Sequence, residues 1–148
     1  MPLVPQNLYL TFHIVSIYLS YIAFFVASVA AVLYLVQNHA LKYKQAGIIF
    51  SRLPDLSFLD KLNYRSISLG FPLLTLAILS GLIWTKNIYG VYWSSYNYYR
   101  ESSCLVLWLL YALILHVRLS RKLHGRKVAV LSLFAFFVII LSLFGSCL

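Results

Sequence analysis

LYLTFHIVSIYLSYIAFFVASVAAVLYLV, residues 8–36, decides the fold, because it contains no lysine, arginine, aspartate or glutamate. Three more uncharged apolar runs follow it, at Ile67–Trp84, Cys104–Val117 and Val128–Leu148. A helix needs about 20 apolar residues to cross a bilayer. The chain of 148 residues is 62% hydrophobic and only 10% charged, which is more apolar surface than a soluble domain of this length can cover. The sequence therefore predicts an all-α, polytopic membrane protein with four transmembrane helices.

No internal repeat or low-complexity tract divides the chain, so residues 1–148 are predicted to form a single membrane domain. No basic residue precedes the first apolar run, which favours a retained helix over a cleaved signal peptide. Gly81 allows a close neighbour to the second span, and serines 16, 20 and 28 give the first span a small-residue face. The outer loop is predicted at residues 86–101, and the spans at about residues 8–36, 66–85, 102–119 and 127–146.

The basic residues are concentrated between the first and second spans and between the third and fourth. Of 12 lysine and arginine residues, only Lys86 and Arg100 fall between spans two and three. The positive-inside rule then puts both basic loops in the cytoplasm and both termini outside. The net charge of +9 thus reflects membrane topology, and no nucleic-acid module or nucleic-acid partner is expected.

The first basic loop contains RLPDLSFLDKLNYR, residues 52–65, in which leucine recurs every three residues with charges between. Pro54 suits the first turn of a helix. This pattern predicts a short amphipathic helix in the first cytoplasmic loop, lying on the inner membrane surface before the second span.

Two histidines lie inside the apolar runs, His13 near the outer end of the first span and His116 near the inner end of the third. An ionisable side chain at membrane depth is costly and often functional, and neutral imidazole is a common axial ligand of haem iron. The structural alternative is a snorkelling histidine bonded to a backbone carbonyl. Their depths differ by about 15 Å at the rise of a helix, whereas two ligands of one iron lie about 4 Å apart. If both bind haem, they serve separate sites.

Cys104 and Cys147 both fall near the outer ends of predicted spans. If those helices are adjacent, an oxidising exterior permits a disulfide, and otherwise the two cysteines act as small apolar residues. The chain has no CxxC, haem-attachment or zinc spacing, and its three carboxylates form no catalytic constellation. We therefore expect no enzyme activity and no metal site other than haem iron.

Three stretches deserve comparison: residues 52–84, WLLYALILHVR at residues 108–118 and HGRK at residues 124–127. In this order they resemble the CcsA/ResC and HemX family of cytochrome c assembly membrane proteins. Residues 52–84 resemble the segment that leads into the family's haem-handling loop, and residues 108–118 fit the pattern WLxYAxxLHxR. HGRK at residues 124–127 resembles the turn into the next family helix. The resemblance covers nearly the whole chain and corresponds to the C-terminal half of a full-length member.

The family's Trp-rich outer loop follows the pattern WGxYWxWDPKE and is thought to present a flat aromatic surface to haem. Gly90, Tyr92 and Trp93 match its start, and Glu101 matches its glutamate. Between them, Trp-Asp-Pro is replaced by the polar and aromatic run SYNYY at residues 95–99, so the loop is a degenerate version.

The resemblance implies roles for particular residues. His13 resembles an external haem ligand, and His116 resembles a ligand of a separate, intramembrane haem. Their partner ligands are absent from the chain. The loop aromatics Tyr92, Trp93 and Tyr96 would stack on the porphyrin, and Arg100 or Lys86 would pair with the propionates. Glu101 belongs to the same haem-binding set as the match to the motif's glutamate.

The resemblance thus implies a divergent haem-handling or accessory membrane protein of cytochrome c biogenesis that works within a complex. The expected partners are the lipid bilayer and a membrane protein that supplies the missing half, or a ResB/CcsB-like subunit. The expected location is the bacterial inner membrane or an equivalent organellar membrane. Two alternatives stay open: a HemX-like accessory of haem biosynthesis, and a non-catalytic structural subunit of a larger membrane complex, such as a respiratory one, that has lost haem binding.

Overall fold

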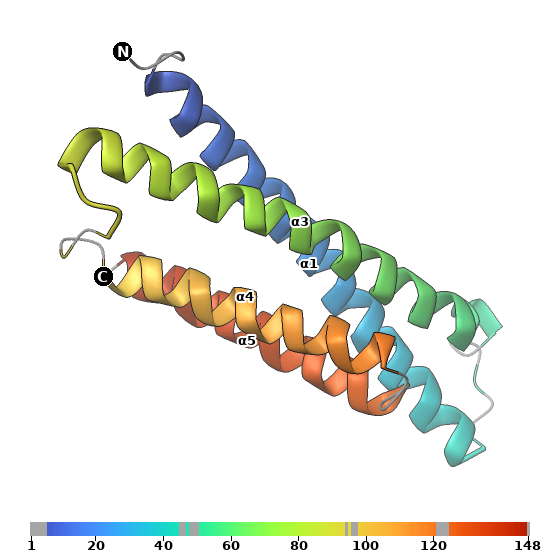
Figure 1. Cartoon of the computed structure of the whole chain (residues 1–148). Helices are drawn as coiled ribbons and strands as arrows, with labels where there is room; N and C mark the ends of the chain where they lie inside the picture. Colours follow the sequence, from blue (N-terminus) through green and yellow to red (C-terminus); the bar gives the residue numbers. More distant parts are fainter. Residues whose placement is uncertain are drawn as a thin grey trace.

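Four long helices make up most of the computed structural model, which describes residues 6–44, 47, 51–93, 95, 98–120 and 125–147. The helices are α1 (Gln6–Lys42), α3 (Leu56–Tyr89), α4 (Tyr98–Leu119) and α5 (Arg126–Cys147) (Figure 1). All four are long and apolar enough to cross a membrane, and these described ranges contain no strand. The predicted all-α fold with four membrane-spanning helices is confirmed.

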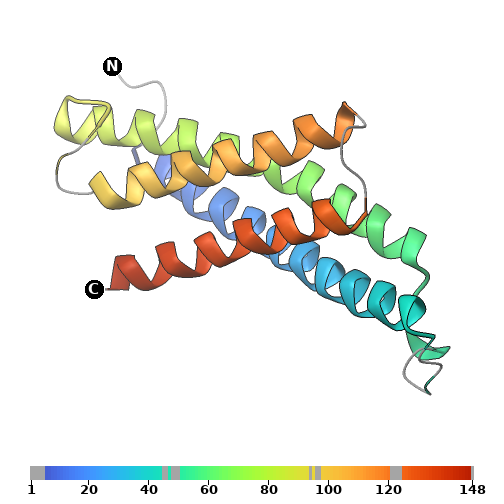
Figure 2. The same ribbon diagram turned by 90° about the horizontal axis from the view of Figure 1, so that it is seen from below.

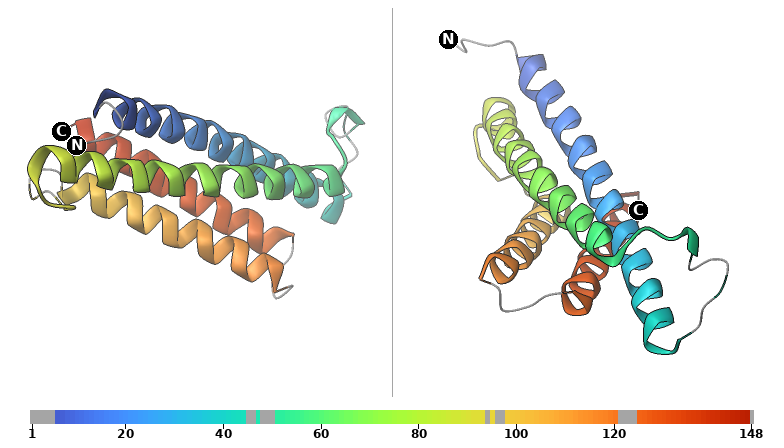
Figure 3. Two further views of the ribbon diagram at one scale, coloured as in Figure 1. Left: turned by 45° about the horizontal axis from the view of Figure 1, so that its top comes forward. Right: turned by 90° about the vertical axis from the view of Figure 1, so that its right-hand side faces the viewer.

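The helices form an antiparallel bundle in which each packs mainly against two neighbours. The α1–α3 contact is the most extensive; α5 packs against α1, and α4 packs against α3 and α5. Figure 2 shows α4 running along α3 with α5 set apart from it, and the right-hand view of Figure 3 shows α4 and α5 on one side of α1 and α3. One end of the bundle, here called the aromatic end, carries the start of α1, the end of α5 and residues 89–93 (Figure 1). The other, basic end carries the end of α1, the start of α3, the end of α4 and the start of α5 (Figure 1).

The predicted short amphipathic helix is not a separate element, and that prediction was wrong. Residues 56–65 are the first turns of α3, which continues without a break to Tyr89. Leu59 and Asn63 are only 1% and 4% exposed, and Asn63 donates a hydrogen bond to the Ala27 carbonyl of α1. A leucine repeat near the helical period fits a helix packed on another helix as well as one lying on a membrane. Here the apolar face of residues 56–65 packs against the neighbouring helix α1.

The lengths of the observed helices differ from the lengths of the predicted spans. α1 has 37 residues and α3 has 34, whereas α4 and α5 have 22 each. At the helical rise, α1 and α3 are roughly 50–55 Å long, against about 33 Å for the other two and about 30 Å for the hydrocarbon core. α1 and α3 therefore continue together past α4 and α5 at the basic end (Figure 1).

A cluster of polar side chains, here called the polar cluster, joins all four helices toward the basic end. Arg118 of α4 pairs with the Asp60 carboxylate of α3 at 2.7 Å and donates to the Asp60 carbonyl at 2.8 Å. It also donates to Asn63 Oδ1 at 3.3 Å. Asn63 Nδ2 in turn donates to the Ala27 carbonyl of α1 at 2.7 Å and to Ser132 Oγ of α5 at 3.0 Å.

The apolar core surrounds this cluster and extends from it toward the aromatic end. The rings of Phe24 and Tyr111 stack at 3.7 Å between centroids with an interplanar angle of 5°. Gly70 of α3 lies beside Phe24, since an added Cβ would approach Phe24 Cε1 to 2.7 Å. The serines of the predicted small-residue face of α1 are buried, as expected for close helix contact.

The turn before α5 depends on Gly125. Its φ is +63°, and a Cβ at this position would lie 2.5 Å from the hydroxyl oxygen of Tyr34. We expect Gly125→Ala to lower the free energy of unfolding by about 1–2 kcal/mol, because the left-handed backbone and the clash both oppose a side chain. Gly145→Ala, with nothing within 4 Å of its added Cβ, is the matched control. Thermal unfolding in detergent micelles measures both, and equal melting of the two variants would contradict the prediction.

Candidate functional site

His13 lies about two turns into α1, at the aromatic end, with its ring against α3. Its Nδ1 is 2.7 Å from the carbonyl oxygen of Ala77. Gly81 follows one turn later on the same face of α3, and a Cβ there would lie 2.9 Å from Nδ1 and 3.0 Å from Cε1. The close neighbour that Gly81 was predicted to admit is therefore the His13 imidazole. Contact with a backbone carbonyl is also what the structural alternative for His13 predicted.

His116 lies three residues before the end of α4, at the basic end. Its side chain is exposed on the surface of the bundle, as are Leu109 and Leu113, which precede it by two turns and one turn of α4. The structure does not bring His13 and His116 together, since they lie on different helices near opposite ends of the bundle.

The segment after α3 presents an exposed aromatic surface. Gly90 ends α3 with a φ of +72°, and its N–H donates to the Lys86 carbonyl at 2.9 Å. Lys86 Nζ donates to the Tyr92 hydroxyl and lies 4.3 Å from the centroid of the Tyr92 ring. Trp93 meets the edge of Tyr98 at 6.5 Å between centroids. The exposed aromatic residues, here called the aromatic surface, are Tyr89, Tyr92, Trp93, Tyr98 and Tyr99.

The remaining candidates are in or before the first turn of α4. Arg100 is exposed, whereas Glu101 is partly buried and its Oε2 has no hydrogen-bond partner among the described residues. Cys104 follows one turn later as a free thiol, so no disulfide forms there. Tyr96 lies outside the described residues.

His13 and the aromatic surface lie at the same end of the bundle. Gly81, which contacts His13, and Tyr89 of the aromatic surface are eight residues apart on α3, or about 12 Å along the helix. In the described part of the chain, no three His, Cys, Asp or Glu side chains gather where they could hold a metal ion.

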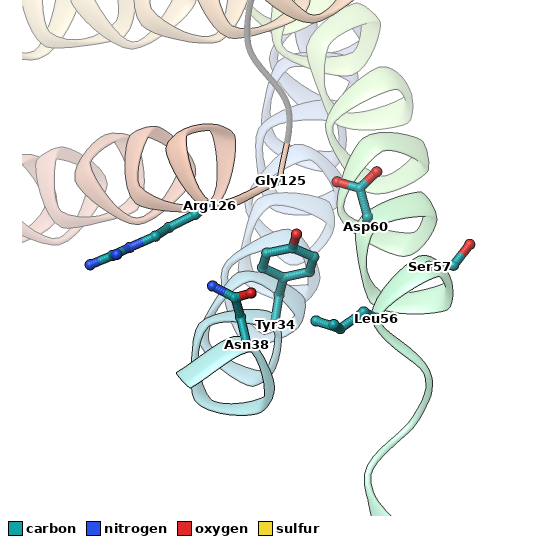
Figure 4. A pocket seen from close by; sticks show the side chains of 7 residues that line it. All are labelled: Tyr34, Asn38, Leu56, Ser57, Asp60, Gly125 and Arg126. Carbon is teal, nitrogen blue, oxygen red and sulfur yellow. The ribbon is translucent and has the colours of Figure 1, made fainter. Parts of the chain in front are cut away.

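The basic end carries an open cleft of about 440 Å³ (Figure 4). It is lined by Tyr34, Asn38, Leu56, Ser57, Asp60, Gly125 and Arg126. This lining includes no histidine or cysteine and lies at the opposite end of the bundle from His13. The cleft is therefore not part of the candidate site.

Two sets of contacts could hardly be predicted from the sequence: the contact of His13 with Ala77, and the contacts of Arg118. The Ala77 carbonyl is a backbone group, so no residue type identifies it as the partner of His13. The small residues Ala77 and Gly81, one turn apart, are the only pattern that marks the point of contact. The partners of Arg118 lie 55 to 58 residues away in the sequence and follow no periodicity that would connect them.

Comparison with known proteins places the chain among cytochrome c assembly proteins. Residues 2–148 match a family model described as "Cytochrome C assembly protein". The chain is 36% identical to the cytochrome c biogenesis protein CcsA of Chlamydomonas reinhardtii over 93% of its own length and 38% of that protein. It is 34% identical to CcsA of Guillardia theta over 93% of its own length and 51% of that protein. Against CcsA of Prochlorococcus marinus (strain NATL1A), identity is 45% over 59% of the chain and 27% of that protein.

The chain thus spans about half, or less, of the length of the curated relatives it matches. No solved structure matches it.

Proposed function

The chain belongs to the cytochrome c assembly protein family, and from that premise we propose that it is a haem-handling membrane component of cytochrome c assembly. A role in cytochrome c assembly is supported by the CcsA proteins that resemble it over 93% of its length. One observation carries the haem-handling part of the proposal. His13 and the aromatic surface lie at the same end of one bundle, about 12 Å apart along α3.

In this proposal the residues of the chain hold haem and do no bond-making chemistry. Bound haem would supply an iron atom that accepts an imidazole nitrogen. His13 would present an imidazole nitrogen to that iron, and Tyr92 and Trp93 would cover the porphyrin with exposed rings. Arg100, exposed at the start of α4, would pair with a propionate. Glu101 and Tyr96 belong to the same loop by resemblance to the family motif.

His116 would serve a second, separate site. Its side chain faces away from the bundle, so any group that meets it comes from outside the four helices described. A partner membrane protein that supplies the rest of a full-length relative, or a ResB/CcsB-like subunit, would complete this site. The assembly would work in a bacterial inner membrane or an equivalent organellar membrane.

The test is haem binding by the chain purified in nanodiscs together with the proteins that copurify with it. We expect haemin titration to give a Soret band, and we expect His13→Ala to lower haem affinity by about 10- to 100-fold, because an axial ligand is lost. His39→Ala is the matched control, since His39 is exposed on the same helix at the basic end. A wild-type complex without Soret absorbance would refute the proposal, as would a His13→Ala complex that keeps its pigment.

A second candidate is a non-catalytic structural subunit of a larger membrane complex. Two observations favour it: Trp-Asp-Pro is missing from the loop, and His116 is exposed away from the bundle. This candidate predicts that a His13→Ala/His116→Ala double variant assembles and functions as the wild type does. Loss of function with normal assembly in the double variant would exclude it.

A further inference from the structure

We propose that Ala77 and Gly81 form a seat on α3 that orients His13 as an iron ligand, with Nδ1 protonated and Nε2 left to bind. The role of this seat in iron binding rests on the proposed function, whereas its geometry does not. It assigns positioning roles to two residues that carry no functional group in their side chains. The contact to Ala77 fixes the tautomer of the ring, and the contact to Gly81 fixes its location.

The tautomer follows from hydrogen-bond chemistry. A carbonyl oxygen can only accept, so at 2.7 Å from the Ala77 oxygen, Nδ1 must carry the proton and donate it. A neutral imidazole has a single N–H, and its other nitrogen then holds a lone pair. The nitrogen left free to bind a metal is therefore Nε2. Histidines that ligate metals almost always donate their other ring N–H to a carboxylate, a backbone carbonyl or water, which fixes the ring and raises its basicity.

The location of the ring depends on the missing side chain at position 81. An added Cβ would lie 2.9 Å from Nδ1 and 3.0 Å from Cε1, too close for either atom to stay in place. The ring could escape only by moving away from α3, which would lengthen the Nδ1 contact to the Ala77 carbonyl. A glycine inside a helix costs about 0.5–1 kcal/mol relative to alanine. The close approach of the His13 ring explains why a residue without a side chain occupies this helical position despite that cost.

The same helix offers a matched control in Gly70. It also sits inside α3 against an aromatic ring of α1, with an added Cβ 2.7 Å from Phe24 Cε1. Phe24 has no hydrogen bond to lose. Gly70→Ala should therefore disturb helix packing at least as much as Gly81→Ala while leaving His13 on its seat.

The first experiment uses the haem-free protein, so it does not depend on haem binding. The protein is labelled with ¹⁵N-histidine in nanodiscs, and His13 is identified among the four histidines by the loss of its signals in His13→Gln. The protonated and unprotonated nitrogens of neutral imidazole have well-separated ¹⁵N shifts. We expect His13 to show the Nδ1–H tautomer in the wild type and in Gly70→Ala, and to lose it in Gly81→Ala. An Nε2–H tautomer in the wild type would overturn the inference, whether or not any variant folds.

The second experiment measures haemin affinity in the same nanodiscs. We expect Gly81→Ala to weaken binding by about 10- to 100-fold, the range for lost outer-shell partners of a metal ligand, and Gly70→Ala to leave it unchanged. His13→Asn separates seating from ligation, because its amide can donate to the Ala77 carbonyl but cannot replace imidazole at iron. It should keep wild-type stability and lose haem. Unchanged affinity in Gly81→Ala would overturn the inference.

The two proposals fail in different ways. A wild-type protein that shows the Nδ1–H tautomer but binds no haemin would refute the proposed function and support the seat. A wild-type protein that binds haemin through His13 with the other tautomer would support the function and refute the seat.

Discussion

Replacing Arg118 with methionine is expected to lower the free energy of unfolding by about 2–3 kcal/mol, because the substitution leaves the Asp60 carboxylate and Asn63 Oδ1 without their Arg118 donor. The Arg118 side chain is 12% exposed, donates to Asp60 and Asn63, and lies 4.8 Å from the centroid of the Tyr64 ring. Methionine keeps much of the volume but removes every donor. The Asp60 side chain is 38% exposed and can regain water, so the loss stays below the roughly 3–5 kcal/mol typical of a fully buried pair.

Unfolding in mixed detergent micelles, followed by tryptophan fluorescence, measures this loss. Arg65→Met is the matched control, because Arg65 is an exposed arginine of the same end of the bundle and should tolerate the change within about 0.5 kcal/mol. Asp60→Asn keeps an acceptor for Arg118 and should cost less than Arg118→Met. If Arg118→Met and Arg65→Met unfold alike, the polar cluster does not hold the bundle together.

The sequence was enough to predict the four helices because a lipid environment leaves the backbone few choices. Uncharged runs long enough to span a bilayer must satisfy their own hydrogen bonds, and in a short chain of this kind they do so as helices. The helix ends were less predictable. Polar turns such as Asn38–Lys42 belong to α1 although they lie beyond the apolar run. Hydropathy describes contact with lipid, whereas Asn38 in these turns lies across the basic-end cleft from the first turns of α3.

The candidate site was predictable in its residues but not in its contacts. His13 stood out because an ionisable side chain is rare in an apolar run, and Gly81 stood out as a point of close approach. That the two meet depends on the rotation and depth of α1 against α3, which no local pattern encodes. The Arg118–Asp60 pair shows the same limit. Asp60 lies in the predicted loop between the first two spans, and Arg118 lies at the end of the predicted third span, so no local pattern connects them. Both contacts are set by how the helices pack.

Replacing Tyr111 with alanine is expected to lower the free energy of unfolding by about 3–4 kcal/mol, the largest effect of a single truncation in this core. Tyr111 is 0% exposed, and its ring stacks on Phe24 at 3.7 Å, while Phe24 lies close against Gly70. Alanine would remove the ring from the contact between α1, α3 and α4. Lipid cannot fill the space because helices enclose it, so dispersion contacts are lost on every side. About 0.5–1.5 kcal/mol of the loss belongs to the ring pair itself and should appear as coupling in a double-mutant cycle with Phe24→Leu.

Tyr111→Phe separates the ring from its hydroxyl. The Tyr111 hydroxyl is buried and has no hydrogen-bond partner among the described residues. An unpaired buried hydroxyl costs free energy, so phenylalanine should keep the stack and leave stability unchanged or raise it by about 1 kcal/mol. Tyr18→Ala, at a tyrosine that is 65% exposed on α1, should change stability by no more than about 0.5 kcal/mol. If Tyr111→Phe instead destabilises the protein as much as Tyr111→Ala, the hydroxyl has a partner that matters, and the stacked rings are not what holds α4 to α1.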